Sequence, residues 1–105
     1  MADRYVVLLR MSDEQREDVR NKSITDFLGR QLERNGGRLL SLYLTAGSYD
    51  GVAIFELDSA LIIAFAQSMP RWIGECTILR ALEEEEADLA ARDWVEPETA
   101  PKLGP

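Results

Sequence analysis

The sequence predicts an α+β fold in which four strands form an antiparallel sheet and two helices cover one of its faces. Short runs rich in apolar and β-branched residues alternate with segments of helical periodicity, in the order strand, helix, strand, strand, helix, strand. Residues 39–57, in the middle of the chain, contain two strand-like runs joined by a short turn, which is typical of a hairpin. The other elements are placed around this hairpin.

The first part of the chain supplies one strand and one helix. Residues 4–11 are predicted to form a central strand, because both of their alternating faces are apolar. A single helix over 13–35 would be about 35 Å long at ~1.5 Å per residue and would overhang that strand, so 12–22 is expected to be a polar loop or a short helical turn. The helix is placed over 24–35, where an apolar stripe recurs at helical intervals: Ile24, Phe27, Leu28 and Leu32.

Capping side chains mark where helical segments begin. Ser12 and Gln15 have the spacing of a capping box, and Ser23 with Asp26 offers a second helix start. Gly36 predicts the end of the helix that Ser23 begins, because glycine takes up the left-handed backbone conformation that commonly ends a helix.

The remaining elements follow from the same patterns. Strands are predicted over 38–44, 49–57 and 75–82, and a second helix is expected to begin at Asp58 or Ser59 and to end by Pro70. In the strand over 38–44, one face is expected to be core. Because successive side chains alternate between faces, one face would carry Leu40, Leu42 and Leu44, and the other would carry Leu39, Ser41, Tyr43 and Thr45.

This order of elements, with right-handed crossovers, most simply gives a ferredoxin-like βαββαβ domain with strand order 4-1-3-2. The first and third strands are then antiparallel neighbours. Their register is expected to set Arg4 near Glu56 and Arg10 near Asp50.

Both central strands are apolar on two faces, although helices cover only one face of such a sheet. An apolar face left open to water calls for a second cover. A second subunit is the expected cover, which predicts a homodimer, or higher oligomer, of the dimeric α/β-barrel type.

Composition excludes several kinds of catalytic site. The absence of histidine removes serine–histidine and cysteine–histidine catalysis, histidine haem ligation and the usual zinc sites. The single cysteine, Cys76, permits no internal disulfide and is expected to be a small buried hydrophobic residue. Gly36-Gly37 has no accompanying nucleotide-binding motif, so no cofactor and no metal are expected.

The net charge of −7 is concentrated at the end of the chain. Residues 1–82 contain 11 acidic and 10 basic side chains, whereas residues 83–105 contain 8 and 2. A near-neutral body with an acidic tail argues against a nucleic-acid partner. No apolar run approaches the length of a membrane span and no signal peptide is predicted, so a cytoplasmic protein without a membrane partner is expected.

Four groups of residues resemble a known family. They are Gly36-Gly37, the turn with Gly47, Tyr49 and Asp50, the segment Glu56-Leu57-Asp58 before a helix, and the spaced residues Gly74, Thr77 and Ala81. Together they resemble the GYD domain family of small bacterial and archaeal proteins, from Tyr5 to Leu82. The resemblance implies a ferredoxin-like domain of dimeric α/β-barrel type and brings no catalytic residues. Residues 12–22 and 83–105 are not explained by it.

The turn with Gly47, Tyr49 and Asp50 has a structural and a functional interpretation. In the structural one, the glycine takes a positive φ, the aspartate bonds nearby amides and the tyrosine covers the edge of the core. In the functional one, Tyr49, Asp50 and Glu56 surround a pocket beneath the sheet, where a desolvated carboxylate acts as a base on a small acidic substrate. The structural interpretation is favoured, and no residue is assigned as catalytic.

The end of the chain is expected to form an acidic helix or arm over 83–96, followed by a disordered tail over 97–105. An isolated helix of this length is marginal in water, so it is expected to dock. Docking on its own domain, residues 1–82, or on a twin is favoured over docking on another protein. In the second case the partner would bind Glu83, Glu84, Glu85, Glu86 and Trp94.

These observations predict a non-catalytic, self-associating domain that serves as an accessory or regulatory subunit. Such a subunit would belong to a larger enzyme complex or bind a small molecule between its sheets. The alternative is a small cofactor-independent enzyme, an isomerase, lyase or monooxygenase, that uses Asp50 or Glu56 with Tyr49.

Overall fold

The sheet of the computed structural model, which describes residues 2–21 and 23–99, has four antiparallel strands in the order β2-β3-β1-β4. This is the predicted strand order, and each strand lies within two residues of its predicted place. The strands are β1 Ala2–Arg10, β2 Arg38–Leu44, β3 Gly51–Asp58 and β4 Glu75–Ala81.

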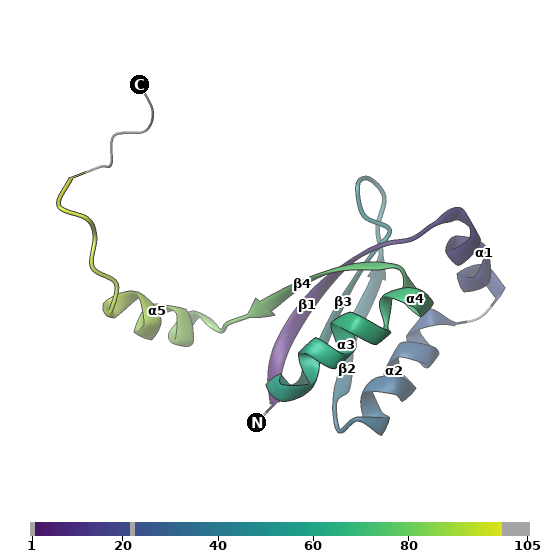
Figure 1. Cartoon of the computed structure of the whole chain (residues 1–105), viewed down its shortest axis with the longest axis horizontal. Coiled ribbons are helices and arrows are strands. Elements are labelled where there is room, and N and C mark those ends of the chain that lie inside the picture. Colours follow the sequence, from purple (N-terminus) through teal and green to yellow (C-terminus); the bar gives the residue numbers. More distant parts are fainter. Residues whose placement is uncertain (1, 22, 100–105) are drawn as a thin grey trace.

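Helices α2 and α3 lie on one face of the sheet, as the ferredoxin-like prediction requires (Figure 1). The helical elements are α1 Asp13–Asn21, α2 Ile24–Arg34, a 3₁₀ turn Ser59–Leu61, α3 Ile62–Ser68, α4 Pro70–Ile73 and α5 Glu84–Arg92. None of the helices in the described ranges is long and apolar enough to cross a membrane.

The core lies between the sheet and α2, α3 and α4. Strands β1 and β3 contribute alternate residues to it, because successive side chains of a strand point to opposite faces. The buried hydrophobic residues are Tyr5, Val7, Leu9, Met11, Ile24, Leu28, Leu32, Ala53, Phe55, Leu57, Phe65, Met69 and Ile73.

The segment 12–22 was expected to be a loop or a short turn, but α1 is a helix of nine residues. The predicted capping box is present, with Ser12 N donating to Gln15 Oε1 at 2.9 Å and Gln15 N donating to Ser12 Oγ at 3.2 Å. The length argument excluded one continuous helix, yet it left room for two. A new helix begins after Ser23, whose hydroxyl accepts a hydrogen bond from Asp26 N at 3.2 Å.

The expected alternation in β2 is interrupted by a β-bulge between Leu39 and Ser41. Leu39 is paired with Phe55 and Leu42 with Ala53, so these two leucines, three residues apart, both pack against the core. The bulge contributes one extra residue, which shifts the alternation by one position. The expected common face of Leu40, Leu42 and Leu44 is therefore wrong, and Leu44 is exposed.

One further expectation about the helices is corrected and another is confirmed. Phe27, expected in the buried stripe of α2, is 39% exposed and packs on Trp72, with ring centroids 6.2 Å apart. The second predicted helix ends by Pro70 as expected, because α3 ends at Ser68, but a short separate helix that was not predicted, α4, begins at Pro70. Proline is compatible with the first position of a helix, where the missing N–H would have no helical partner.

The predicted register of β1 and β3 is confirmed, with Arg4 opposite Glu56. At the other end of the pair, Leu9 lies opposite Gly51, which brings Arg10 to the level of Asp50. Of the tail expected to be disordered over 97–105, residues 97–99 have no regular structure and 100–105 lie outside the described residues.

Candidate functional site

The loop between β2 and β3 is closed by its own hydrogen bonds. Thr45 Oγ1 donates to the carbonyl oxygen of Tyr49 at 2.6 Å, and Thr45 N donates to the carbonyl oxygen of Asp50 at 3.0 Å. Gly47 has a φ of 116°, a value that side chains with a Cβ rarely allow. The glycine therefore serves the tight turn, as the structural interpretation predicts.

The carboxylate of Asp50 joins three elements. Its Oδ2 accepts a hydrogen bond from Met11 N at 2.6 Å, at the end of β1. Arg16 of α1 donates from Nε to Oδ1 at 3.0 Å and from its NH2 group to Oδ2 at 3.3 Å. The main chain of Asp50 is also held, because its N–H donates to the carbonyl oxygen of Leu9 at 2.7 Å.

These contacts hold the pKa of Asp50 below its ordinary value of 3.8, first through the hydrogen bond from Arg16 and then through that from Met11. Both carboxylate oxygens already accept hydrogen bonds from the chain. An ionised group with occupied oxygens is suited to fastening the corner of β1, α1 and β3, and a depressed pKa is opposite to what a general base working near neutral pH needs.

Tyr49 faces a different partner. The guanidinium carbon of Arg10 lies 5.2 Å from the centre of the Tyr49 ring, within the range of a cation–π contact. Arg10 Nε also donates to the carbonyl oxygen of Ser48 at 3.2 Å. Tyr49 and Asp50 therefore point to separate arginines.

Glu56 lies at the far end of β3 from Asp50, about 20 Å away at ~3.3 Å per residue. It forms an ion pair with Arg38 of β2 at 2.7 Å. It also borders a shallow hollow of about 470 Å³ beside the start of α5, which neither Tyr49 nor Asp50 lines. The structure does not bring the three candidate residues Tyr49, Asp50 and Glu56 into one site.

The face of the sheet opposite the helices is apolar at its centre. We call it the open face and define it by the residues of β1, β3, β4 and β2 that alternate with the core residues: Val6, Leu8, Val52, Ile54, Leu79 and Tyr43. The four residues of β1 and β3 are half-buried, and Leu79 and Tyr43 are 49% and 61% exposed. Charged residues bracket this face at both ends, with Arg4 and Glu56 at one end and Arg10 and Glu75 at the other.

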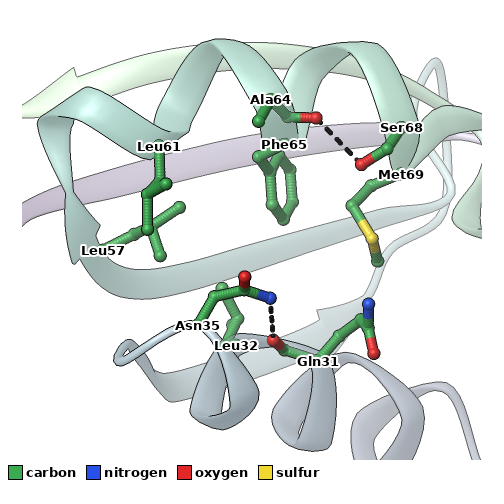
Figure 2. A pocket seen from close by; sticks show the side chains of 9 residues that line it. All are labelled: Gln31, Leu32, Asn35, Leu57, Leu61, Ala64, Phe65, Ser68 and Met69. Atoms are coloured by element: carbon green, nitrogen blue, oxygen red, sulfur yellow. Dashed lines mark hydrogen bonds between the residues drawn. The ribbon is translucent and has the colours of Figure 1, made fainter.

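A groove runs along the opposite side of the molecule, between α2 and α3 (Figure 2). A hollow of about 80 Å³ is lined by Gln31, Leu32, Asn35, Leu57, Leu61, Ala64, Phe65, Ser68 and Met69. A second hollow of about 420 Å³ lies on the surface of α2 alone and adjoins the first at Gln31; its other lining residues are Ser23, Asp26, Phe27, Arg30 and Arg34. We call the two hollows together the helical groove.

Figure 2 shows how the floor of the first hollow is made. Leu61, Phe65 and Met69 point from the α3 side toward α2, where Gln31 and Asn35 face them. The Asn35 amide already donates to the carbonyl oxygen of Gln31 at 2.8 Å, and Ser68 Oγ donates to that of Ala64 at 2.8 Å. The groove is therefore apolar at its base and polar at its rim.

Residues 83–96, the acidic arm, extend away from the domain (Figure 1). They contain α5, and every residue of the arm is exposed, including Trp94 at 69%. Glu83 forms an ion pair with Arg4 at 3.7 Å. The Cα radius of gyration is 17.3 Å, against about 13 Å for a compact chain of this length, because the arm is not packed on the domain.

Cys76 lies on the core side of β4, where it packs against the core. Burial, followed by the nearby Glu75, raises the pKa of its thiol from 9.0 to about 11. A protonated thiol is a poor nucleophile, which supports the structural interpretation of this residue.

Two contacts of the candidate residues were not predicted from the sequence. Arg16, the partner of Asp50, lies in the segment expected to be a loop, and its signal was its place four residues after the capping residue Ser12. Arg38, the partner of Glu56, starts a strand whose side-chain directions depend on the bulge. Within the described ranges, no cluster of three or more histidine, cysteine, aspartate or glutamate residues has the geometry to hold a metal ion.

Comparison with known families gives one match. The family model of the GYD domain matches residues 5–91, which includes α1 and nearly all of α5. The match is longer than the resemblance noted from the sequence, which ended at Leu82 and left residues 12–22 and 83–105 unexplained. No curated protein and no solved structure matches the chain at a significant level.

Proposed function

The chain belongs to the GYD domain family, and we propose that it is a non-catalytic, self-associating accessory or regulatory domain that works through its open face. In this proposal two copies pack sheet against sheet as a dimeric α/β barrel. The dimer then acts as a subunit of a larger enzyme complex or holds a small molecule between its two sheets.

The observation that carries the proposal is the uncovered apolar centre of the open face. Val6, Leu8, Val52 and Ile54 form a continuous group on β1 and β3, and each is only half-buried in the single chain. Exposed contiguous apolar surface of this kind is typical of association sites. A two-fold axis would bring the same patch of both copies together, and self-complementary patches are what such symmetric dimers require.

The bracketing charges support a defined orientation of two such sheets. Each end of the open face holds a basic and an acidic residue, Arg4 with Glu56 and Arg10 with Glu75. Two copies can therefore oppose unlike charges at the rim while their apolar centres meet. Rim charges of this kind add register and specificity more than affinity.

The contacts of the candidate residues support a non-catalytic role. Asp50 fastens the corner of the sheet, Tyr49 is covered by Arg10, and Glu56 is paired with Arg38. Each of the three thus has a structural task in the folded chain.

Sedimentation velocity tests the proposal. We expect the full chain to be at least dimeric at micromolar concentration, and Leu79→Glu to lower its average mass by placing an unpaired charge in the sheet contact. Ile63→Glu is the matched control, because Ile63 is 67% exposed on α3, away from the open face. Near-ultraviolet circular dichroism of both variants verifies that they remain folded. A wild-type chain that stays monomeric, or equal effects of the two substitutions, would contradict the proposal.

A further inference from the structure

The acidic arm is a helix without a surface to pack on. Helix α5 has nine residues, all exposed, and a free helix of that length is marginal in water. One side of it carries Ala87 and Ala91, four residues apart. Trp94 follows just past the end of the helix, where its N–H donates to the carbonyl oxygen of Ala91 at 3.1 Å. A surface that accepts this apolar side would stabilise the helix.

The helical groove carries basic residues that have no ionic partner among the described residues. Arg30 and Arg34 line the groove on α2. Arg71 of α4 lies over the ring of Trp72, 5.4 Å from its centre, and Trp72 packs on the lining residue Phe27. None of these three forms an ion pair with another residue in the parts of the chain that the structure describes. On the open face, by contrast, Arg4 and Arg38 already pair with glutamates.

The spacing of charges on the arm matches the spacing on the groove. Arg30 and Arg34 are four residues apart on α2, and Glu84 and Asp88 are four residues apart on α5 beside its apolar side. Two helices side by side in opposite directions would set Glu84 next to Arg34 and Asp88 next to Arg30. This direction also places the amino end of α5 near the carboxyl end of α2, which favours the two helix dipoles.

The same alignment gives Trp94 an aromatic neighbourhood. Trp94 is about 9 Å beyond Asp88 along the chain axis at ~1.5 Å per residue, which brings it to the amino-terminal part of α2. Phe27 and Trp72 are partly exposed there and pack on each other. A buried tryptophan flanked by ion pairs is a common anchor of protein interfaces.

The arm cannot place α5 in its own groove. Only Leu82 and Glu83 separate β4 from α5, and two residues span at most about 7 Å. Helix α3 lies between β4 and the groove, and a helix is about 10 Å wide (Figure 1). The occupant of the groove must therefore come from another molecule.

We propose that the acidic arm of one copy docks in the helical groove of a second copy, with α5 antiparallel to α2, Glu84 and Asp88 beside Arg34 and Arg30, and Trp94 against Phe27 and Trp72. This contact does not require the sheet-to-sheet dimer, because it uses the other side of the domain. Where both contacts form, the arms link dimers into larger assemblies.

Sedimentation equilibrium of full-length chains at low salt tests the contact. Arg30→Glu with Arg34→Glu is expected to weaken association through the arm at least tenfold, and Trp94→Ala by a similar factor. Two adjacent glutamates give a variant and its matched control. Glu84→Arg should weaken association several-fold. Glu85→Arg should change association less than twofold, because Glu85 lies on the side of α5 away from the apolar stripe. Raised salt should weaken the wild-type contact, because exposed charges are screened.

Mixing two variants identifies a second copy as the occupant. The chain with Arg30→Glu and Arg34→Glu keeps the native arm, and the chain with Glu84→Arg and Asp88→Arg keeps the native groove. Each alone should fail to associate through the arm, and a mixture should associate again, since native arm meets native groove and reversed arm meets reversed groove. Arg30→Gln with Arg34→Gln replaces the first variant if that variant does not fold.

The outcomes separate this inference from the proposed function. Leu79→Glu should remove the sheet contact and leave the arm contact intact, while Glu84→Arg with Asp88→Arg should do the reverse. Unchanged association of the arm and groove variants, or a mixture that does not recover, would overturn the inference. Either result would mean that the acidic arm of a second copy does not occupy the helical groove.

Discussion

Strand β3 presents neighbouring side chains to two different environments. Phe55, on the core face, is 0% exposed and packs on Phe65, with ring centroids 4.8 Å apart. Ile54, on the open face, is half-buried beside Val6. One face of the sheet therefore supplies the core of the single chain, while the other leaves apolar side chains partly in contact with water.

The largest expected effect tests the difference between these two neighbours. Phe55→Ala should lower the free energy of unfolding by about 3–5 kcal/mol, because it leaves a cavity in the core. Ile54→Ala should cost about 1 kcal/mol in a dilute, monomeric sample, because its side chain is already partly in water. Urea denaturation measures both values. A loss of stability in Ile54→Ala that grows with protein concentration would show that association buries the open face, and equal losses for the two variants in dilute solution would contradict the prediction.

A thiol on the core face of β4 and a thiol on its open face should react with a labelling reagent at rates that differ by about a hundredfold. Cys76 is on the core side of β4, and its pKa of about 11 is two units above the ordinary 9.0, so its thiolate is about a hundredfold scarcer. The variant with Cys76→Ser and Thr77→Cys moves the thiol to the exposed neighbour on the open face. It should react with a disulfide reagent at pH 8 far faster than the native chain. Comparable rates in native and unfolded wild type would contradict the prediction.

An intermediate effect is expected at the carboxylates near the two ends of β3. Asp50→Asn should lower the melting temperature more than Glu56→Gln, because Asp50 holds both Met11 and Arg16, whereas Glu56 forms an ion pair with Arg38 alone. Thermal denaturation at pH 7 measures the order. The reverse order would show that the corner of the sheet does not depend on the Asp50 carboxylate.

The pH dependence of stability follows from the same carboxylate. The pKa of Asp50 is lowered by folding, so its contribution is fully present above the unfolded-state value near 3.8 and is lost as the pH falls below it toward the folded-state pKa. Melting temperatures between pH 6 and pH 3 should fall less steeply for Asp50→Asn than for the wild type. Parallel curves would contradict this assignment.

The smallest effect is expected at the exposed ion pair of Arg38 and Glu56, whose side chains are 70% and 30% exposed. Exposed pairs of this kind contribute about 0.2–1 kcal/mol. Glu56→Gln should lower the free energy of unfolding by no more than that, and 0.5 M salt should remove most of the difference. A larger loss would mean that the end of the open face is covered in solution.

The sequence was sufficient for those features that depend on local chemistry or on alternation. The strand order followed from the succession of elements, and the hydrogen-bonded partners at the helix starts, Ser12 with Gln15 and Ser23 with Asp26, were visible as spacings. The opposition of Arg4 and Glu56 followed from the antiparallel register of two uninterrupted strands.

The remaining features depend on long-range geometry. The bulge in β2 has no distinctive residue, since Leu39 and Leu40 are equally apolar, and it is favoured by packing of Leu39 and Leu42 on the core. The partners of Asp50 and Glu56 depend on α1 and on this bulged strand, so neither was predicted. The distance between Asp50 and Glu56 could be inferred from their spacing in the sequence. The hydrogen bonds that Asp50 accepts from Met11 and Arg16 could not.

The bulge in β2 also affects the edge of the sheet. Strand β2 is an outer strand, and an outer strand offers unpaired backbone groups to which a strand from another molecule can add. A bulge increases the local twist and disrupts the regular spacing of those groups. Growth of the sheet by strand addition at β2 is therefore disfavoured.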